Sequence, residues 1–155
     1  MTREELIDRI ARAVAEREGF FVTEAQAKAR GIQWPTRAQR NANPGNIRAW
    51  RDAQHRPYPT AGGYVNFLAW ALERFPGASE EEVRRQALSE GWRVLHVLMG
   101  QYIDGKYTGG ESLTFEKIFR AYAPAEDHND PSGYARFVAN RLGVRADQPL
   151  SELLV

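Results

Sequence analysis

The sequence contains no cysteine. This absence excludes disulfide bonds, zinc sites built on thiolates and a cysteine nucleophile. An excess of charge of one sign is also missing, because 21 Lys and Arg stand against 20 Asp and Glu and give a formal net charge of +1. Nucleic-acid-binding proteins carry clustered Lys and Arg. Here the arginines are mixed with acids along the chain, so we expect no nucleic-acid partner.

Several other signals are absent. No apolar stretch is long enough to span a bilayer, and the N-terminus has no basic region followed by an apolar one, so we expect neither membrane insertion nor a signal peptide. There is no GxGxxG motif and no P-loop. The three histidines, His55, His96 and His128, lie far apart without the HExxH spacing. We therefore expect no cofactor and no metal.

The hydrophobic pattern predicts a mainly α (α+β) fold in a single domain over residues 1–155. Its one small β element, a hairpin or sheet inserted after the first helix, is expected from Ile47–Arg51 and a segment near Tyr64, joined by an irregular connection at 53–63. The predicted helices cover residues 3–18, 64–75, 79–88, 92–103, 114–122 and 131–142. These ranges follow from apolar spacing and from capping residues at their ends. Thr2 and Glu5 fit a capping box before the first helix, and a polar loop around Asp127 and His128 leads to Asp130 and Pro131, which suit the start of the last helix.

A glutamate stands where the first helix is expected to bury an apolar side chain. The stripe consists of residues spaced by four, namely Leu6, Ile10 and Val14, and its next position is Glu18. Gly19 then ends the helix, and Phe20-Phe21 bring two rings beside the carboxyl group. Apolar surroundings raise the pKa of a glutamate and suit it to general acid catalysis. The alternative is a solvated residue in the last turn of the helix.

The stretch Asn43-Pro44-Gly45-Asn46 predicts a tight turn. Proline fixes φ at the second position, and we expect a positive φ at Gly45, as in a type II turn. The two asparagines serve either the geometry of this turn or the binding of a ligand.

These features together resemble the lysozyme-like superfamily, in which a glutamate at a helix end faces a small β sheet across a sugar-binding groove. Glu18-Gly19-Phe20-Phe21 followed by residues 40–48 resembles a phage and prophage family of lytic transglycosylase-like or virion structural proteins, with an EGF motif before R-x-N-N-P-G-N. The similarity continues through residues 61–67, Glu90-Gly91-Trp92 and residues 122–134. Ala42, where the family has Asn, and Tyr122, where it has Trp, depart from that pattern.

The resemblance implies that Glu18 is the general acid and base that cleaves a β-1,4 bond between N-acetylmuramic acid and N-acetylglucosamine in peptidoglycan. It implies that Asn43 and Asn46 bind the sugars. Tyr64, Tyr122 and Tyr134 are candidate groove walls on which sugar rings stack, although tyrosines on such helices are more often core residues.

Hydrolysis requires a second carboxylate near the acid. Asp52 is the candidate, with a solvated turn residue as the alternative. Without a second carboxylate, Glu18 acts first as acid and then as base, and the substrate's own 6-hydroxyl attacks. This is the lytic transglycosylase scheme, and the resemblance favours it.

The alternative function is a non-catalytic structural or glycan-binding component of a phage or phage-tail-like particle. A third interpretation is a small helical interaction domain without a groove. The expected partners are peptidoglycan glycan strands and other virion or tail proteins. The expected location is the virion or the host cytoplasm, with action in the periplasm or cell wall.

Overall fold

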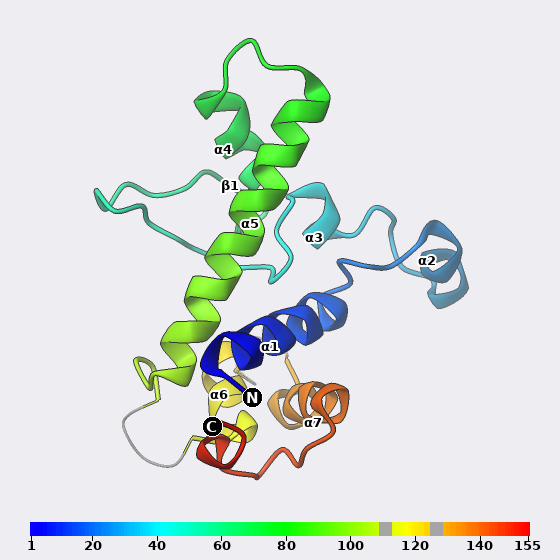
Figure 1. The fold of residues 1–155 in the computed structure, drawn as a ribbon. Coiled ribbons are helices and arrows are strands. Elements are labelled where there is room, and N and C mark those ends of the chain that lie inside the picture. The colour runs from blue at the N-terminus through cyan, green and yellow to red at the C-terminus, as the bar shows by residue number, and fades with distance from the viewer. Residues whose placement is uncertain (109–112, 125–128) are drawn as a thin grey trace. The chain divides into compact units, whose positions relative to one another are not determined.

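The computed structural model describes residues 1–108, 113–124 and 129–155, and it is mainly helical with one small antiparallel sheet, as the sequence predicts (Figure 1). The helices are α1 (Arg3–Arg17), α2 (Glu24–Arg30), α3 (Arg37–Arg40), α4 (Phe67–Arg74), α5 (Glu80–Ile103), α6 (Phe115–Tyr122), α7 (Pro131–Leu142) and a 3₁₀ turn, η2 (Leu150–Glu152), and the strands are β1 (Thr60–Ala61) and β2 (Tyr64–Val65). The polar loop predicted around Asp127 and His128 lies outside the described residues.

The chain divides into two compact units. The first unit consists of Met1–Arg17 with His96–Val155, and the second unit is Glu18–Leu95. The single lysozyme-like domain over residues 1–155 therefore stays a prediction.

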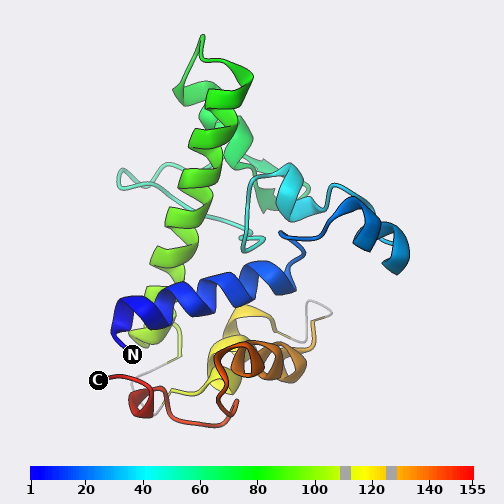
Figure 2. The ribbon, with the colours of Figure 1, turned by 45° about the vertical axis from the view of Figure 1, so that its right-hand side comes forward.

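The first unit is a helical core. In it α7 packs against both α1 and α6 (Figure 2). The apolar stripe of α1 is buried as expected, together with side chains of the other two helices, among them Phe115, Phe119, Val138 and Leu142. Asp130 accepts a hydrogen bond from the N–H of Gly133 and Pro131 opens α7. The predicted start of α7 is thereby confirmed.

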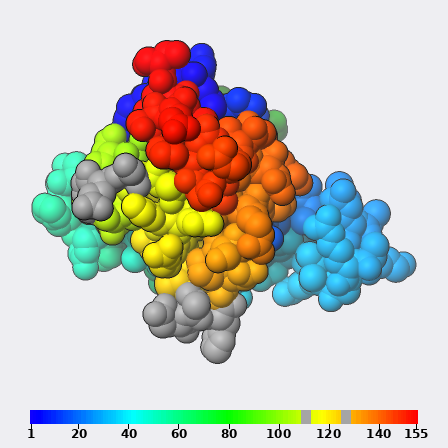
Figure 3. Space-filling model, turned by 90° about the horizontal axis from the view of Figure 1, so that it is seen from below, coloured from blue at the N-terminus to red at the C-terminus, as the bar shows by residue number. Residues whose placement is uncertain are grey.

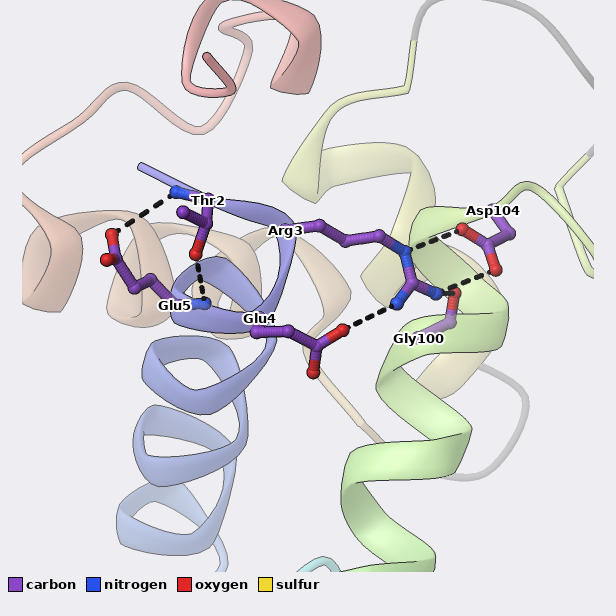
Figure 4. A network of polar contacts seen from close by, with 6 residues as sticks. All are labelled: Thr2, Arg3, Glu4, Glu5, Gly100 and Asp104. Atoms are coloured by element: carbon purple, nitrogen blue, oxygen red, sulfur yellow. Dashed lines mark hydrogen bonds and ion pairs between the residues drawn. The ribbon is translucent and has the colours of Figure 1, made fainter.

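The start of α1 is fixed by two polar contacts within the first unit (Figure 4). Thr2 and Glu5 exchange backbone-to-side-chain hydrogen bonds of 3.1 and 3.2 Å, which is the predicted capping box. Arg3 binds the carboxylate of Asp104 with Nε at 3.1 Å and Nη2 at 2.8 Å. The chain ends also meet, since the N-terminal amine donates to the carbonyl of Leu153 at 3.0 Å (Figure 3).

The β element of the second unit differs from the prediction. β1 pairs with β2, with Thr60 opposite Val65 and Ala61 opposite Tyr64. Both residues of the connecting turn, Gly62 and Gly63, have positive φ values of 61° and 85°. Two such residues in succession give the type I′ turn that matches strand twist, so this Gly-Gly pair forms the hairpin rather than an irregular connection.

Ile47–Arg51, which we expected to be a strand, is not one. The segment is linked to β2 by one backbone hydrogen bond of 2.8 Å, from the N–H of Val65 to the carbonyl of Ile47. Arg51 makes only an isolated bridge, to Pro57. Proline has no N–H to donate to a ladder, and Pro57 and Pro59 interrupt the opposing segment.

Two predicted helix boundaries are also wrong. α4 begins at Phe67 rather than at residue 64, because Asn66 caps it by accepting from the N–H of Ala69. Residues 79–88 and 92–103 were predicted as separate helices, but α5 runs through both as one helix of 24 residues. Gly91 lies inside this helix and does not end it.

Gly91 marks a close approach between α5 and the turn at Asn43–Asn46, here called the asparagine turn. A Cβ atom built on Gly91 would lie 2.3 Å from the carbonyl oxygen of Ala42 and 3.0 Å from Cδ of Pro44. Only glycine lets the helix backbone come this near to the turn. A glycine in a helix interior destabilises the helix by about 1 kcal/mol relative to alanine, and here the close packing against the turn requires it.

We predict that Gly91→Ala lowers the free energy of unfolding by about 1–3 kcal/mol, because the added methyl displaces the backbone of the turn. Gly100→Ala, on the same helix, is the control: its Cβ would meet the flexible guanidinium of Arg3 at 3.1 Å. That change should be neutral or stabilising by up to about 1 kcal/mol. Urea unfolding of both variants checks this, and equal destabilisation would contradict the close approach.

Candidate active site

Asn43 organises the turn that faces Glu18 in the second unit. Its side chain has no exposed surface. Nδ2 donates to the carbonyls of Ile47 and Val65, each at 3.0 Å, and Oδ1 accepts from the N–H of Ile47 at 2.9 Å. One amide therefore joins the turn to strand β2. The role of Asn43 as a sugar ligand stays a prediction, while its role in turn geometry is visible.

The turn places Asn46 against the candidate acid. Its N–H donates to the carbonyl of Asn43 at 3.1 Å. The positive φ that we expected at Gly45 occurs instead at Asn46, with a value of 47°. Asparagine tolerates this left-handed conformation better than most residues. It turns the chain so that the N–H of Ile47 can reach Asn43.

Glu18 and Asn46 are in direct contact. Glu18 is half-buried, directly after α1, and its Oε1 accepts a hydrogen bond of 3.3 Å from Nδ2 of Asn46. The other end of that amide, Oδ1 of Asn46, is buried and has no donor among the described residues. Buried acceptors are nearly always paired. The site thus holds a carboxyl group beside an acceptor that a bound ligand could satisfy.

Three aromatic rings cluster in the second unit, two of them on the residues that follow Glu18 and Gly19. Phe20 contacts Phe21 and Trp92 edge-to-face, with ring centroids 5.4 and 5.6 Å apart, and Phe21 stacks on Trp92 at 6.1 Å. Phe21 is 52% exposed. The rings expected after Glu18 therefore form a partly open apolar wall, which Trp92 completes from α5.

Helix α3 holds the backbone that follows Glu18. Thr36 donates through its hydroxyl to the carbonyl of Gly19 at 3.0 Å, and Gln39 donates through Nε2 to the carbonyls of Phe20 and Val22 at 3.1 and 2.7 Å. Thr36 and Gln39 also form a capping box on α3. This pair was not predicted from the sequence, although the spacing T-x-x-Q is a recognisable capping signal.

Glu90 precedes Gly91 on α5 and binds two side chains of the second unit. Its carboxylate accepts hydrogen bonds from the Tyr58 hydroxyl at 2.7 Å and from Nε of Arg93 at 2.5 Å. Burial by itself would raise the pKa of Glu90, but the hydrogen bonds from Arg93 and Tyr58 outweigh it and lower the pKa. Burial and the bond to Glu90 raise the pKa of Tyr58 to about 12. Glu90, Gly91 and Trp92 therefore have three separate structural roles.

Asp52 is engaged within its own loop. Its Oδ1 accepts from the N–H groups of Gln54 and Arg56, each at 2.9 Å, and its Oδ2 binds Nε of Arg56 at 2.8 Å. The backbone bond from Arg56, opposed by burial and aided by the Arg56 side chain, lowers the pKa of Asp52. Asp52 also borders a hollow of about 310 Å³ that is lined further by Trp70 and Arg74. Its role as a second carboxylate stays a prediction.

The three tyrosines predicted as groove walls fall in both units. Tyr64 belongs to the second unit, where the guanidinium groups of Arg37 and Arg48 lie over its ring. Tyr122 and Tyr134 belong to the first unit. Tyr134 is 4% exposed and stacks on Phe119 with centroids 4.6 Å apart, and Tyr122 meets both of these rings edge-to-face. The structure thus brings Glu18, Asn43 and Asn46 together, and Tyr64 lies next to Val65, a partner of Asn43.

We predict that Asn43→Ala lowers the free energy of unfolding by about 2–4 kcal/mol, because it leaves buried backbone groups of Ile47 and Val65 without partners. Asn140→Ala, at an exposed position of α7, is the control and should change stability by less than about 0.5 kcal/mol. Urea unfolding measures both. Amide exchange at Ile47 should also accelerate in Asn43→Ala, and unchanged exchange would contradict the assigned role.

We predict a pH dependence from Glu90. Because its pKa is lowered in the folded protein, its contribution to stability is fully present above its ordinary value of 4.5 and is lost as the pH falls below it. The stability difference between wild type and Glu90→Gln should therefore shrink between pH 6 and pH 3. Urea unfolding across that range checks this. For Glu81→Gln, which removes an exposed carboxylate from the same helix, the difference should change less.

Comparison with known proteins adds no family. No family model matches the chain, and no curated protein or solved structure matches it either. None of the described helices combines the length and apolar character of a membrane span, and the described residues contain no cluster of three His, Asp or Glu side chains suited to a metal ion. Function must therefore be argued from the chemistry of the Glu18 site.

Proposed function

We propose that the chain cleaves the glycan strand of bacterial peptidoglycan at the β-1,4 bond between N-acetylmuramic acid and N-acetylglucosamine, with Glu18 as the general acid and base. The observation that carries the proposal is the Glu18–Asn46 pair. Asn46 positions the carboxyl group through a hydrogen bond of 3.3 Å, and its buried Oδ1 lacks a donor among the described residues. A sugar hydroxyl or an acetamido N–H is a donor of the required kind.

The surroundings of this pair also suit a saccharide. Phe21 is exposed and stacked on Trp92, so the segment that follows Glu18 offers an apolar ring surface, while Asn46 offers a polar amide. Sugars present C–H faces and hydroxyl edges, and a site for them needs both kinds of surface. The motif resemblance of Glu18-Gly19-Phe20 and of the asparagine turn agrees with this substrate class.

In the proposed reaction Glu18 gives its proton to the glycosidic oxygen as the bond from C1 of the muramic acid to that oxygen breaks. Positive charge develops at C1, and the acetamido group of the same sugar assists in carrying it. The 6-hydroxyl oxygen of that sugar then bonds to C1, and its proton returns to the Glu18 carboxylate. The products are a strand with a 1,6-anhydro end and a strand with a free 4-hydroxyl.

The transglycosylase form is preferred over hydrolysis because of the state of Asp52. Both of its oxygens are bound within the loop that it closes, to Gln54 and Arg56. Hydrolysis would require a carboxylate available to act on a water molecule or on the sugar. A single glutamate that alternates between acid and base needs no such partner.

We predict that Glu18→Gln reduces the rate of lysis of chloroform-treated Gram-negative cells by at least about 100-fold, because the amide cannot supply the proton. Glu24→Gln, an exposed carboxylate on α2, is the matched control and should lyse at the wild-type rate. Equal, negligible lysis by wild type and Glu18→Gln would contradict the enzyme and favour a structural or glycan-binding component of a phage particle.

Mass spectrometry of the products from purified sacculi then identifies the reaction. Anhydro-muramic ends are expected from wild type. Reducing muramic ends would instead indicate a hydrolase and would make Asp52→Asn the next variant to examine.

A further inference from the structure

The near-zero net charge of the chain conceals an uneven distribution. Residues 24–56 contain seven Lys and Arg against two Asp and Glu, a local net charge of +5 within a chain of net charge +1. One of those two acids, Asp52, is paired with Arg56. This part of the second unit therefore carries a clear excess of positive charge next to the candidate active site.

Two of these arginines converge on one ring. The guanidinium carbon of Arg37 lies 4.3 Å from the ring centroid of Tyr64, and that of Arg48 lies 5.5 Å from it. Both arginines are exposed, and Tyr64 is half-buried. A cation–π contact restrains a guanidinium through its flat face. The ring covers the flat face of the guanidinium and not its N–H edge, which is the edge through which arginine binds anions.

The cluster of Arg37, Arg48 and Tyr64, here called the arginine–tyrosine cluster, is built on the framework that holds Glu18. Arg37 follows Thr36, which binds the carbonyl of Gly19. Arg48 lies two residues after Asn46, the partner of Glu18. All of these residues belong to the second unit.

The third member is tied in through its neighbour. Tyr64 precedes Val65, whose carbonyl is bound by Asn43 at 3.0 Å. Three separate connections therefore fix the arginine–tyrosine cluster relative to the candidate acid.

The guanidinium group of Arg37 has hydrogen-bond donors that no described residue uses. Within the described ranges, no carboxylate or carbonyl accepts a hydrogen bond from its guanidinium group. By contrast Arg56, Arg85 and Arg93 of the same unit are engaged by Asp52, Glu82 and Glu90. An arginine that is restrained by a ring and unpaired at its N–H edge is prepared for a bidentate contact with a carboxylate.

We propose that the arginine–tyrosine cluster is a carboxylate-binding subsite that selects anionic glycan strands over uncharged ones. This inference rests on the proposed function for the identity of its ligand. Peptidoglycan carries carboxylates in two places: on the lactyl group of muramic acid once its peptide is removed, and on the stem peptide while it is attached. Polymers of N-acetylglucosamine alone carry none.

The test measures binding with the full chain carrying Glu18→Gln, which prevents digestion of the probes. The three probes are soluble strands with stem peptides, the same strands after amidase treatment, and chitohexaose. Arg37→Ala in this background should weaken binding of at least one carboxylate-bearing strand by about 10-fold, as expected for a charge-assisted contact at an exposed site. Binding of chitohexaose should be unchanged. Loss on amidase-treated strands assigns the site to the lactyl group, and loss only on peptide-bearing strands assigns it to the stem peptide.

Two further variants separate recognition from general charge. Arg30→Ala removes one exposed positive charge from α2, in the same basic segment but outside the arginine–tyrosine cluster, and should change binding less than twofold. Arg37→Lys keeps the charge but loses the planar fork, so its binding should be weaker than that of the parent. Equal losses in Arg37→Ala and Arg30→Ala, or an equal loss for chitohexaose, would overturn the proposal.

The outcome is independent of turnover. If wild type releases no products from sacculi while Arg37→Ala selectively weakens binding of carboxylate-bearing strands, the proposed enzyme fails and the subsite stands. If wild type releases products and Arg37→Ala binds every probe as its parent does, the subsite fails and the enzyme stands.

Discussion

The candidate site depends on the buried amide of Asn43. Its three hydrogen bonds connect the turn to Ile47 and to β2, in a region where the described strands are only two residues long. So short a sheet supplies little stabilisation of its own. The buried amide of Asn43 instead holds these segments together, as the hydrogen bonds of a longer strand ladder would. Because the amide is hydrogen-bonded and has no exposed surface, disrupting it is costly. The positions of Asn46 and Tyr64 both follow from it.

The helix behind the turn imposes a second constraint, one of space rather than of bonding. Gly91 removes the side chain that would keep α5 away from Ala42, while Glu90 and Trp92 on either side bind Tyr58 and the phenylalanine rings. Three consecutive residues of α5 thus act differently: Glu90 makes a polar contact, Gly91 allows a close backbone approach and Trp92 makes an apolar contact. Such close packing leaves little freedom for the backbone near Glu18.

Sequence reasoning succeeded where local chemistry determines structure. The capping residues of α1 and α7 and the helical periodicity of the body were read correctly, because caps and apolar stripes act over a few residues. The turn at Asn43–Asn46 was also located in this way, although its positive φ lies at Asn46 rather than at Gly45, and the catalytic role of Glu18 stays a prediction. Sequence reasoning failed where a distant contact decides: separate helices were predicted at 79–88 and 92–103, but α5 runs through both ranges and packs Gly91 against Ala42. The gathering of Arg37, Arg48 and Tyr64 had no local signal at all, since it joins three separate segments.

The two ends of the chain are hydrogen-bonded to each other, through the N-terminal amine to Leu153 and the N–H of Val155 to the carbonyl of Met1. The two ends of the described backbone therefore lie side by side within the first unit. A short linker between the ends would span little distance and would cost little closure entropy. The chain is consequently suited to circular permutation, in which the present ends are joined and new ends are opened at an exposed turn such as Gly62-Gly63.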